Sequence, residues 1–419
     1  MRKIKVLLLL HDLSPTGAPK VAVTAFEHFG DRAEVRTITY HGGPLAERAR
    51  RLGPVRTLVS YRWPGGIPTP RALLLFLAHR FLSLGKARLW SQGIRRWKPD
   101  VIYINSVVGL LAAKRLDLPP VPVLLHVHEL DSFLHPMARD APALLLGLPD
   151  LYVAVSEAVA EALTERFGVP AAKVRVVPAF VEEFPLLAPA PAGVEGAPFV
   201  MGGAGVPSWV KGPQLWLLVA AALKKRLGPG RVRFVWVGTS EDEEGWQFKE
   251  MARKLGLTGD TEFVPFTMRP LDYYALFDVF AMTSWQDSFP LVVLEAMLLE
   301  KPVVCFAGSG GARDEVGEAG VVIAEFSPAL MAEAVAALAA DPARRLALGK
   351  SGRARVLEHF TAARQAPALW REIALLAGRP DAADLSAHSS AHSSAHSSAH
   401  SSAHSSAHSS PAEGAQAPP

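Results

Sequence analysis

Two carboxylates, Asp287 and Glu295, stand eight residues apart in the stretch SWQDSFPLVVLEAM, residues 284–297. The apolar run predicts a helix over Leu291–Leu299, which leaves Asp287 in a loop and places Glu295 just inside the helix. The free N–H groups and positive dipole end at the start of a helix suit a diphosphate. A carboxylate accepts hydrogen bonds from the two hydroxyls of a ribose or from sugar hydroxyls. This stretch is therefore a candidate for holding ribose, diphosphate and sugar together.

A plainer interpretation of the stretch is an acidic residue that favours the helix dipole, followed by a solvent-exposed glutamate. That interpretation does not explain why Glu295 lies within the apolar run 291–297. We therefore favour a ligand-binding role for both carboxylates.

A glycine-rich segment, GGAGVPSWVKG over residues 202–212, follows the predicted strand Phe199–Ala204. We expect its glycines to permit the close approach of a phosphate group, and Lys211 to supply a point charge to it. A glycine-rich turn by itself is weak evidence. Its position ahead of the two carboxylates strengthens the interpretation.

A third polar segment, LLHVHEL over residues 124–130, ends a predicted buried strand. If the strand alternates, His126 and His128 face the same side of the sheet. Together with Glu129 they could form a zinc site, but no third ligand is apparent, and a purely structural role is the alternative for each histidine. We expect His128 to face a ligand and leave His126 unassigned.

Short β-branched or leucine-rich runs alternate with longer amphipathic runs, a pattern typical of βαβ units and parallel sheets. The predicted strands are Ile4–Leu10, Val35–Tyr40, Val55–Val59, Val101–Asn105, Val121–His126, Leu151–Val155, Val174–Val177, Phe199–Ala204, Val232–Val237, Thr261–Val264, Val279–Thr283, Val303–Phe306 and Gly320–Ile323. The predicted helices are Lys20–Phe29, Arg71–Trp97, Val108–Leu116, Glu157–Phe167, Pro213–Leu227, Glu244–Leu255, Leu271–Phe277, Leu291–Leu299 and Leu330–Ala339. Ligands of such sheets bind beyond the carboxyl ends of the strands.

A Pro-, Ala- and Gly-rich segment without periodicity predicts a linker over residues 187–198. We therefore expect a Rossmann-like domain over 1–186, a second over 199–360, and a further helix over 361–378. From 380 to 419 the chain is dominated by the repeated unit Ser-Ala-His-Ser, which cannot bury a core and predicts a disordered tail. Its histidines could hold a transition metal only if the tract became helical, which serine disfavours.

These motifs resemble those of the family 4 retaining glycosyltransferases, which have the GT-B fold. The chain has DSFPLVVLEAMLLEKPV over 287–303, where the family has E-x-F-G-x-x-x-x-E-A-M-A-x-G-x-P-V. Residues 202–212 match the Lys-Gly pair of the family's G-R-x-x-x-x-K-G, and 127–129 correspond to its V-H-D. The segment HDLSPTGAP over 11–19 resembles the family's first glycine-containing loop. The resemblance covers roughly residues 1–377.

The resemblance implies a role for each matching position. Glu295 would bind the donor ribose, and Asp287 with the backbone of 289–292 would bind sugar hydroxyls and phosphate. The residues implied in the chemistry are His128, Lys211 and Asp287. The residues implied in donor binding are Gly17, Gly212, Phe289, Pro290, Leu291, Val292 and Glu295.

The sequence departs from the family pattern at several positions. Asp287 replaces a glutamate and is one methylene shorter, so the sugar that it holds can differ. Pro290 replaces a glycine, which removes one backbone donor but suits the first turn of a helix. Asp314 stands at the glutamate of the family's G-G-x-P-E loop. The arginine before the Lys-Gly pair is missing, so Lys211 and helix dipoles, or a basic residue that the sequence does not identify, must neutralise the leaving diphosphate.

The resemblance implies an α/β protein of GT-B fold with a C-terminal crossover helix. It would move a sugar, with retention, from a nucleotide-diphosphate donor on the second domain to an unidentified glycan, lipid or small-molecule acceptor on the first. Cell-envelope or polysaccharide biosynthesis is the expected setting, with no cofactor. No Asp-x-Asp pair occurs in the sequence, so no metal is expected. The alternatives are a GT-B sugar-nucleotide epimerase, which needs acid/base carboxylates aimed at the sugar ring, and a non-catalytic nucleotide-sugar-binding protein.

Basic residues are concentrated in the first half. The chain carries a net charge of +4, whereas residues 1–185 carry +8, and residues 45–98 hold 12 basic residues against Glu47 alone. We expect peripheral contact of 45–98 with an anionic membrane, with an arginine-rich solvated face as an equal alternative, and no nucleic-acid partner. One cysteine, Cys305, excludes a disulfide framework, and the first apolar run is too short for a signal peptide, so we expect a cytoplasmic protein.

Overall fold

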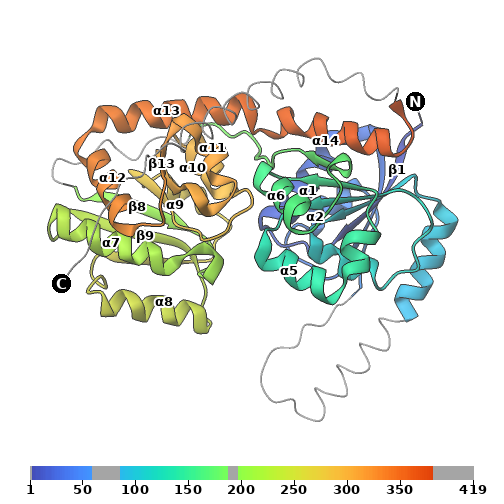
Figure 1. Cartoon of the computed structure of the whole chain (residues 1–419), viewed down its shortest axis with the longest axis horizontal. Coiled ribbons are helices and arrows are strands. Elements are labelled where there is room, and N and C mark those ends of the chain that lie inside the picture. The colour runs from blue at the N-terminus through green and yellow to red at the C-terminus, as the bar shows by residue number, and fades with distance from the viewer. Residues whose placement is uncertain (1, 59–84, 187–196, 381–419) are drawn as a thin grey trace, which may run out of the picture.

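The computed structural model describes residues 2–58, 85–186 and 197–380, which form two α/β halves side by side (Figure 1). The predicted tail, most of the predicted linker and the first part of the helix predicted over 71–97 lie outside the described residues; 85–97 are helical as expected. In the described part of the chain, every strand pairs in parallel with its neighbours. The predicted α/β class with two Rossmann-like sheets is confirmed.

The first half contains one sheet with strand order β3-β2-β1-β4-β5-β6-β7. Its strands are β1 (Ile4–Leu10), β2 (Ala33–Thr39), β3 (Val55–Thr57), β4 (Val101–Asn105), β5 (Val123–Val127), β6 (Leu151–Ala154) and β7 (Val174–Val176). Its helices are α1 (Gly17–Phe29), α2 (Ala46–Leu52), α4 (Leu110–Ala113), α5 (Asp131–Asp140) and α6 (Glu157–Glu161).

The second half contains a sheet with strand order β10-β9-β8-β11-β12-β13. Its strands are β8 (Phe199–Ala204), β9 (Val232–Thr239), β10 (Thr261–Pro265), β11 (Val279–Met282), β12 (Val303–Phe306) and β13 (Val321–Ile323). The helices are α7 (Pro213–Leu227), α8 (Glu243–Lys254), α9 (Pro270–Tyr274), α10 (Leu291–Leu298), α11 (Ala312–Val316), α12 (Pro328–Ala340), α13 (Pro342–His359) and α14 (Ala362–Leu376).

Both sheets share one topology, because the chain adds strands outward from β1 or β8 and then returns to add β4 or β11 on the other side. This is the doubly wound order, and the crevice where the strand order reverses is where such sheets bind ligands. The inner strands of each sheet are buried on both faces; in β1, for example, the five consecutive residues from Val6 to Leu10 have no exposed surface. Continuous apolar runs of this kind are typical of parallel sheets covered by helices on both sides.

The glycines at the end of β8 serve the core of the second half. A β-carbon at Gly202 would lie 2.0 Å from the Phe277 ring, and one at Gly203 would lie 2.5 Å from Trp216 Nε1. Our expectation that these glycines admit a phosphate group is therefore wrong for both positions. They are small because large aromatic side chains pack directly against the strand.

The long helix α13 was not among the predicted helices. Its sequence has few apolar residues and contains Gly349 and Gly352, so neither periodicity nor propensity indicates a helix strongly. Gly349 lets α13 pack closely on the end of α10, since a β-carbon there would lie 2.0 Å from the carbonyl oxygen of Glu300. Tertiary packing thus stabilises a helix that the local sequence disfavours.

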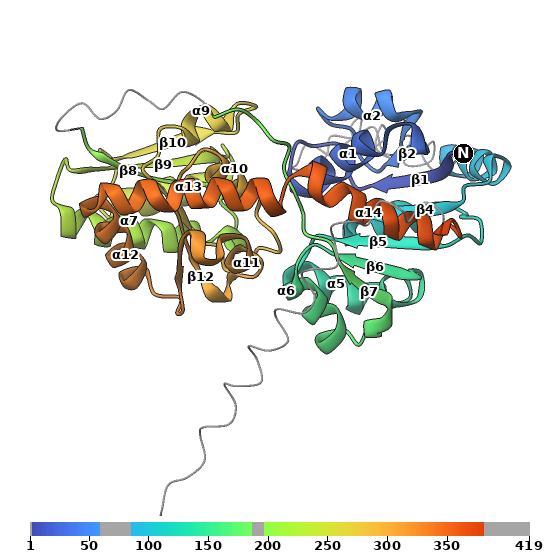
Figure 2. The same cartoon turned by 90° about the horizontal axis from the view of Figure 1, so that it is seen from above.

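The last two helices join the halves, because α13 lies along the second half and α14 runs on over the first (Figures 1 and 2). At the crossing, the backbone of Val181 accepts from Ala362 N at 2.8 Å and donates to Phe360 O at 3.0 Å. Trp370 of α14 is 2% exposed, and its ring lies 5.0 Å from that of Phe29 in α1. The final helix therefore completes the core of the first half.

Among residues 2–58, 85–186 and 197–380, none of the helices combines the length and the hydropathy needed to cross a bilayer. Some basic residues of the first half have acidic partners. Arg48 contacts Glu27 and Glu182, and Arg95 contacts Asp117.

Trp370→Ala should lower the free energy of unfolding by about 3–5 kcal/mol, because it removes a large buried side chain between α14 and α1. Trp246→Ala in α8 is the matched control; this tryptophan is 64% exposed, and we expect a change within about 0.5 kcal/mol. Denaturant unfolding measures both. Equal stability of the Trp370 variant and the wild type would contradict the packing described for α14.

Candidate functional site

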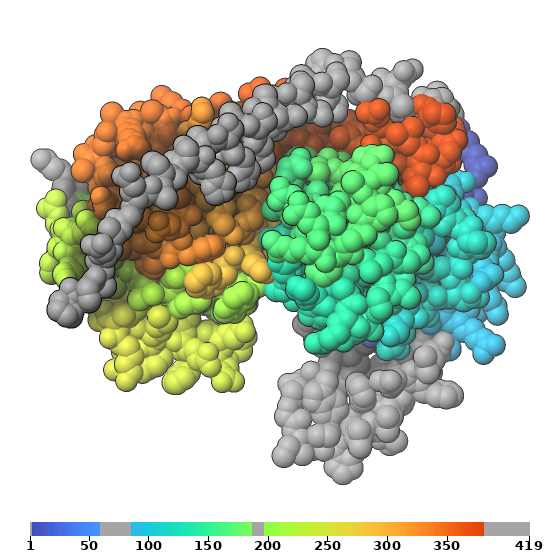
Figure 3. Space-filling view, viewed as in Figure 1, coloured from blue at the N-terminus to red at the C-terminus, as the bar shows by residue number. Residues whose placement is uncertain are grey.

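A cavity of about 320 Å³ lies between the two halves, where the carboxyl ends of both sheets face each other. Figure 3 shows the green atoms of the first half meeting the yellow and orange atoms of the second along this boundary. Eight of the predicted site residues line the cavity: Gly17, His128, Lys211, Asp287, Phe289, Pro290, Leu291 and Val292. Gly212 and Glu295 are not among the lining residues.

Two helices point their N-termini at the cavity. Thr16, Gly17 and Ala18 at the start of α1 line one side, and Pro290 and Leu291 at the start of α10 line the other. Neither helix has a side-chain cap or an acidic residue in its first turn. The backbone N–H groups and the positive dipole ends are therefore available to an anion.

The lysine and the aspartate predicted from the sequence form one ion pair. Lys211 Nζ lies 2.5 Å from Asp287 Oδ2, and the Asp287 side chain is 9% exposed. Ser284 Oγ also donates to Asp287 Oδ2, at 3.4 Å. An ammonium has three N–H donors, so Lys211 can keep Asp287 as a partner and still bind a phosphate oxygen.

Gly212 positions this lysine and does not line the cavity. It adopts the left-handed conformation (φ +61°) between the turn that carries Lys211 and the start of α7. A β-carbon there would lie 2.1 Å from the carbonyl oxygen of Thr283, and Thr283 Oγ1 donates to Gly212 O at 3.1 Å. Glycine at this position therefore lets the Lys211 turn pack on the end of β11.

The Asp287 loop is held by backbone contacts with the loop after β12. Asp287 N donates to Ser309 O at 2.7 Å, and Gly311 N donates to Asp287 O at 3.0 Å. A β-carbon would lie 2.3 Å from Asp287 O if placed on Gly310, and 2.1 Å from Ser288 O if placed on Gly311. Gly310 and Gly311 thus allow the loop after β12 to pack against the Asp287 loop and to hold Asp287 at the cavity.

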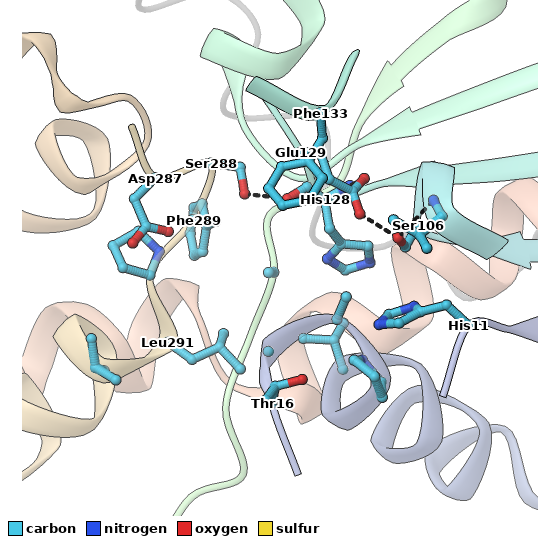
Figure 4. Close-up of a pocket in the computed structure, with 18 of the residues that line it drawn as sticks. His11, Thr16, Ser106, His128, Glu129, Phe133, Asp287, Ser288, Phe289 and Leu291 are labelled. Carbon is cyan, nitrogen blue, oxygen red and sulfur yellow. Dashed lines mark hydrogen bonds between the residues drawn. The ribbon is translucent and has the colours of Figure 1, made fainter. Parts of the chain in front are cut away.

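Neutral imidazoles form the opposite wall, where His11 and His128 lie across from Asp287 and Phe289 (Figure 4). Burial, with smaller contributions from His126 and His11, holds the pKa of His128 well below its ordinary value. Burial likewise lowers the pKa of His11. His128 Nε2 lies 3.0 Å from Asn105 Oδ1, so the proton belongs on Nε2 and Nδ1 is left as an acceptor.

Glu129 organises the loops under these histidines. Its carboxylate accepts from Ser106 Oγ, from Val107 N at 3.1 Å and from His128 N at 3.0 Å. Burial raises its pKa, and these three hydrogen bonds oppose the rise. Glu129 therefore fixes the backbone of His128 at the carboxyl end of β5.

The zinc alternative finds no support in the described ranges. Within residues 2–58, 85–186 and 197–380, no three His, Cys, Asp or Glu side chains are grouped so as to hold a metal ion. His126 bonds the Tyr103 hydroxyl through Nδ1, and burial lowers its pKa to about 3. His126 is thus a neutral member of the core beneath His128.

Two residues near the cavity are not predicted from the sequence. Glu315 in α11 is fully buried, and neither of its carboxylate oxygens has a partner among the described residues. Burial, followed by the charges of Asp287 and Asp314, raises its pKa well above the usual range. Asp314, which the motif selected, is half-buried and pairs with Arg313, whereas its neighbour Glu315 is the acid that lies buried within reach of the charge of Asp287.

The second missed residue is Lys20 in the first turn of α1. Its Nζ lies 2.6 Å from Glu295 Oε1, across the boundary between the halves. Glu295 is 7% exposed, so it is not the solvent-facing glutamate of the plainer interpretation. No sequence motif predicts this contact, because the lysine and the glutamate are 275 positions apart in the chain.

Each half of the chain matches a known family of proteins. The profile "Glycosyltransferase Family 4" matches residues 15–183, and the profile "Glycosyl transferases group 1" matches residues 193–355. The chain belongs to glycosyltransferase family 4. Curated relatives of this family 4 chain include the D-inositol 3-phosphate glycosyltransferases of Kribbella flavida (31% identity over 60% of the chain) and Kineococcus radiotolerans (29% over 59%). The matches span 66% and 64% of those relatives' lengths.

Solved structures show that the family 4 chain has the GT-B fold. Anabaena HepE in complex with UDP-glucose superposes with a TM-score of 0.69 at 20% identity, covering 89% of this chain and 100% of that one. Sucrose-phosphate synthase from Thermosynechococcus elongatus superposes with a TM-score of 0.68 at 19% identity, covering 90% and 99%. At these identities the likeness concerns the fold.

Gly310→Ala should lower the free energy of unfolding by about 1–3 kcal/mol, because the residue has φ +113° and its new β-carbon would meet the backbone of the Asp287 loop. Gly259→Ala is the control, since nothing lies within 4 Å of a β-carbon there. Thermal and denaturant unfolding compare the two variants. If both unfold like the wild type, the Asp287 loop does not depend on this backbone contact.

Proposed function

We propose that the protein is a metal-independent retaining glycosyltransferase that moves a sugar from a nucleotide-diphosphate donor to an acceptor hydroxyl. The observation that carries the proposal is the Lys211–Asp287 pair at the N-terminus of α10, opposite the neutral His128 across one cavity. Membership of family 4 supports it. So does the HepE structure, which is a complex with UDP-glucose.

In this proposal the donor lies on the second half. The diphosphate binds the free N–H groups at the start of α10 and the ammonium of Lys211. Asp287 accepts hydrogen bonds from sugar hydroxyls, and Glu295, one helical turn beyond Leu291, accepts from the ribose. The charge of Lys211 contributes most as the diphosphate leaves, because negative charge grows on it in the transition state.

Two carboxylates line the cavity in the described part of the chain, and neither is free to attack the sugar. Asp287 is paired with Lys211, and Glu129 is held by its three hydrogen bonds. This arrangement favours reaction on one face of the sugar. The bond from the anomeric carbon to the phosphate oxygen breaks, the acceptor oxygen forms the new bond on that face, and the leaving phosphate takes the acceptor's proton.

The same pairing argues against a sugar-nucleotide epimerase, which needs carboxylates that exchange protons with the sugar ring. The wall formed by His11 and His128 is neutral and offers hydrogen bonds to hydroxyl groups, which suits the hydroxyl-bearing acceptor of a hexosyltransferase. We place this acceptor in cell-envelope or polysaccharide biosynthesis. Membrane contact through 45–98, part of which lies outside the described residues, and a cytoplasmic location stay predictions.

Glu295→Ala should weaken donor binding by about 1.5–3 kcal/mol for each hydrogen bond that the ribose loses to a charged acceptor. Lys211→Ala should mainly lower kcat. Steady-state kinetics with a nucleotide sugar identified by thermal stabilisation separates the two effects, and Lys249→Ala, an exposed lysine paired with Glu241, is the control. Wild-type kcat/KM in both site variants would show that the donor binds elsewhere.

Chelator treatment should leave the initial rate of transfer within about twofold, because Lys211 and the start of α10 supply the charge that a metal supplies in other transferases. The measurement should be repeated on a chain ending at Arg379, which takes the histidine-rich tail out of the assay. A rate abolished by chelator and restored by Mg²⁺ or Mn²⁺ would overturn the metal-independent mechanism.

A further inference from the structure

The ion pair between Lys20 and Glu295 lies at the edge of the donor site. Gly17, Ala18 and Pro19, which precede Lys20 in α1, line the cavity, and so do Leu291 and Val292, one turn before Glu295 in α10. The pair therefore joins the two helices whose N-termini face the cavity. The Lys20 side chain keeps 31% of its surface exposed, and the Glu295 side chain, taken without its backbone, keeps 10%.

Lys20 stands where the backbone by itself disfavours a cation. The first turn of α1 contains no acidic residue, and the positive end of a helix repels a lysine placed there. Glu295 supplies the compensating charge from the other half, through one of the three N–H groups of Lys20. No other hydrogen bond of this ammonium occurs among the described residues, so two of its donors remain for a ligand.

The charge balance of the site calls for a second cation. In the described residues Lys211 is the only lysine or arginine that lines the cavity, and Asp287 already neutralises it. His11 and His128 are neutral because burial lowers the pKa of each. A nucleoside diphosphate carries at least two negative charges, and the arginine that the family places before its Lys-Gly pair is missing here.

We infer that Lys20 is a donor-contacting residue, which supplies from the first half the second positive charge for the donor diphosphate. This inference rests on the proposed function. Glu295 holds the ammonium in place without donor; when the donor binds, Glu295 turns its second oxygen to the ribose while Lys20 shares its free N–H groups with the phosphates. The donor site is then complete only when the two halves are together.

The competing explanation is a purely structural pair that closes the empty cavity. In that case Lys20 occupies Glu295, the donor must displace it, and removal of the lysine strengthens donor binding or leaves it unchanged. The two explanations therefore predict opposite changes in affinity for the same substitution.

Calorimetric titration of the full chain with UDP, GDP and ADP, and with the matching nucleosides, tests the inference. Lys20→Met should weaken binding of the diphosphate that the wild type binds by tenfold or more, and binding of its nucleoside by less than threefold. Lys20→Arg should stay within about threefold for both. Lys3→Met is the matched control, because Lys3 is also in the first half and paired with one aspartate, Asp31.

The double variant Lys20→Glu/Glu295→Lys restores an ion pair and so measures what the pair contributes to stability; its thermal unfolding midpoint should lie above that of either single variant. Its diphosphate binding does not separate the two explanations, because Glu295, the proposed ribose ligand, is lost together with Lys20. Unchanged or tighter diphosphate binding by Lys20→Met, whatever its unfolding midpoint, would overturn the inference and leave the proposed function standing. Failure of the wild type to bind any of the three diphosphates would overturn both.

Discussion

The whole site depends on one constraint, which is that all strands of a parallel sheet end on the same edge. Each half therefore gathers its loops and helix N-termini at one side, and the two sides face each other across the cavity. His11, Ser106 and His128 follow three neighbouring strands of the first sheet. Lys211 and Asp287 follow two neighbouring strands of the second. Residues far apart in the sequence thus meet without any long loop to bring them together.

The two walls of the cavity differ in their electrostatics. The wall of the second half holds the charges of Lys211 and Asp287, which are already paired, so a charged ligand joins an existing ion pair and no bare charge needs to be buried before it binds. The wall of the first half holds imidazoles that burial keeps neutral. Such a division suits a reaction in which one substrate is an anion and the other offers a hydroxyl group.

The sequence was sufficient to predict the fold, because the strands are continuous apolar runs bounded by turns. β1, β4, β8, β12 and α7 begin and end at the predicted residues. Motif spacing also placed Asp287 and Lys211, which lie close to conspicuous glycines and a helix start. Motif spacing could not identify Lys20, and it could not show that Glu315 is buried where Asp314 is not. The contact of Lys20 and the burial of Glu315 both depend on segments that are distant in the chain. The helix α13 was not predicted for a related reason, since packing on α10, and not the local sequence, stabilises it.

The crossing of α14 onto the first half has a consequence for synthesis on the ribosome. The sheet of the first half is complete once β7 has emerged, but the face of α1 that Trp370 covers stays open until residues 362–376 follow. The N-terminal half must then wait, with apolar surface exposed, while the whole second half is translated and folds. Nascent chains of this protein would accordingly present this apolar face to chaperones until residues 362–376 emerge and cover it.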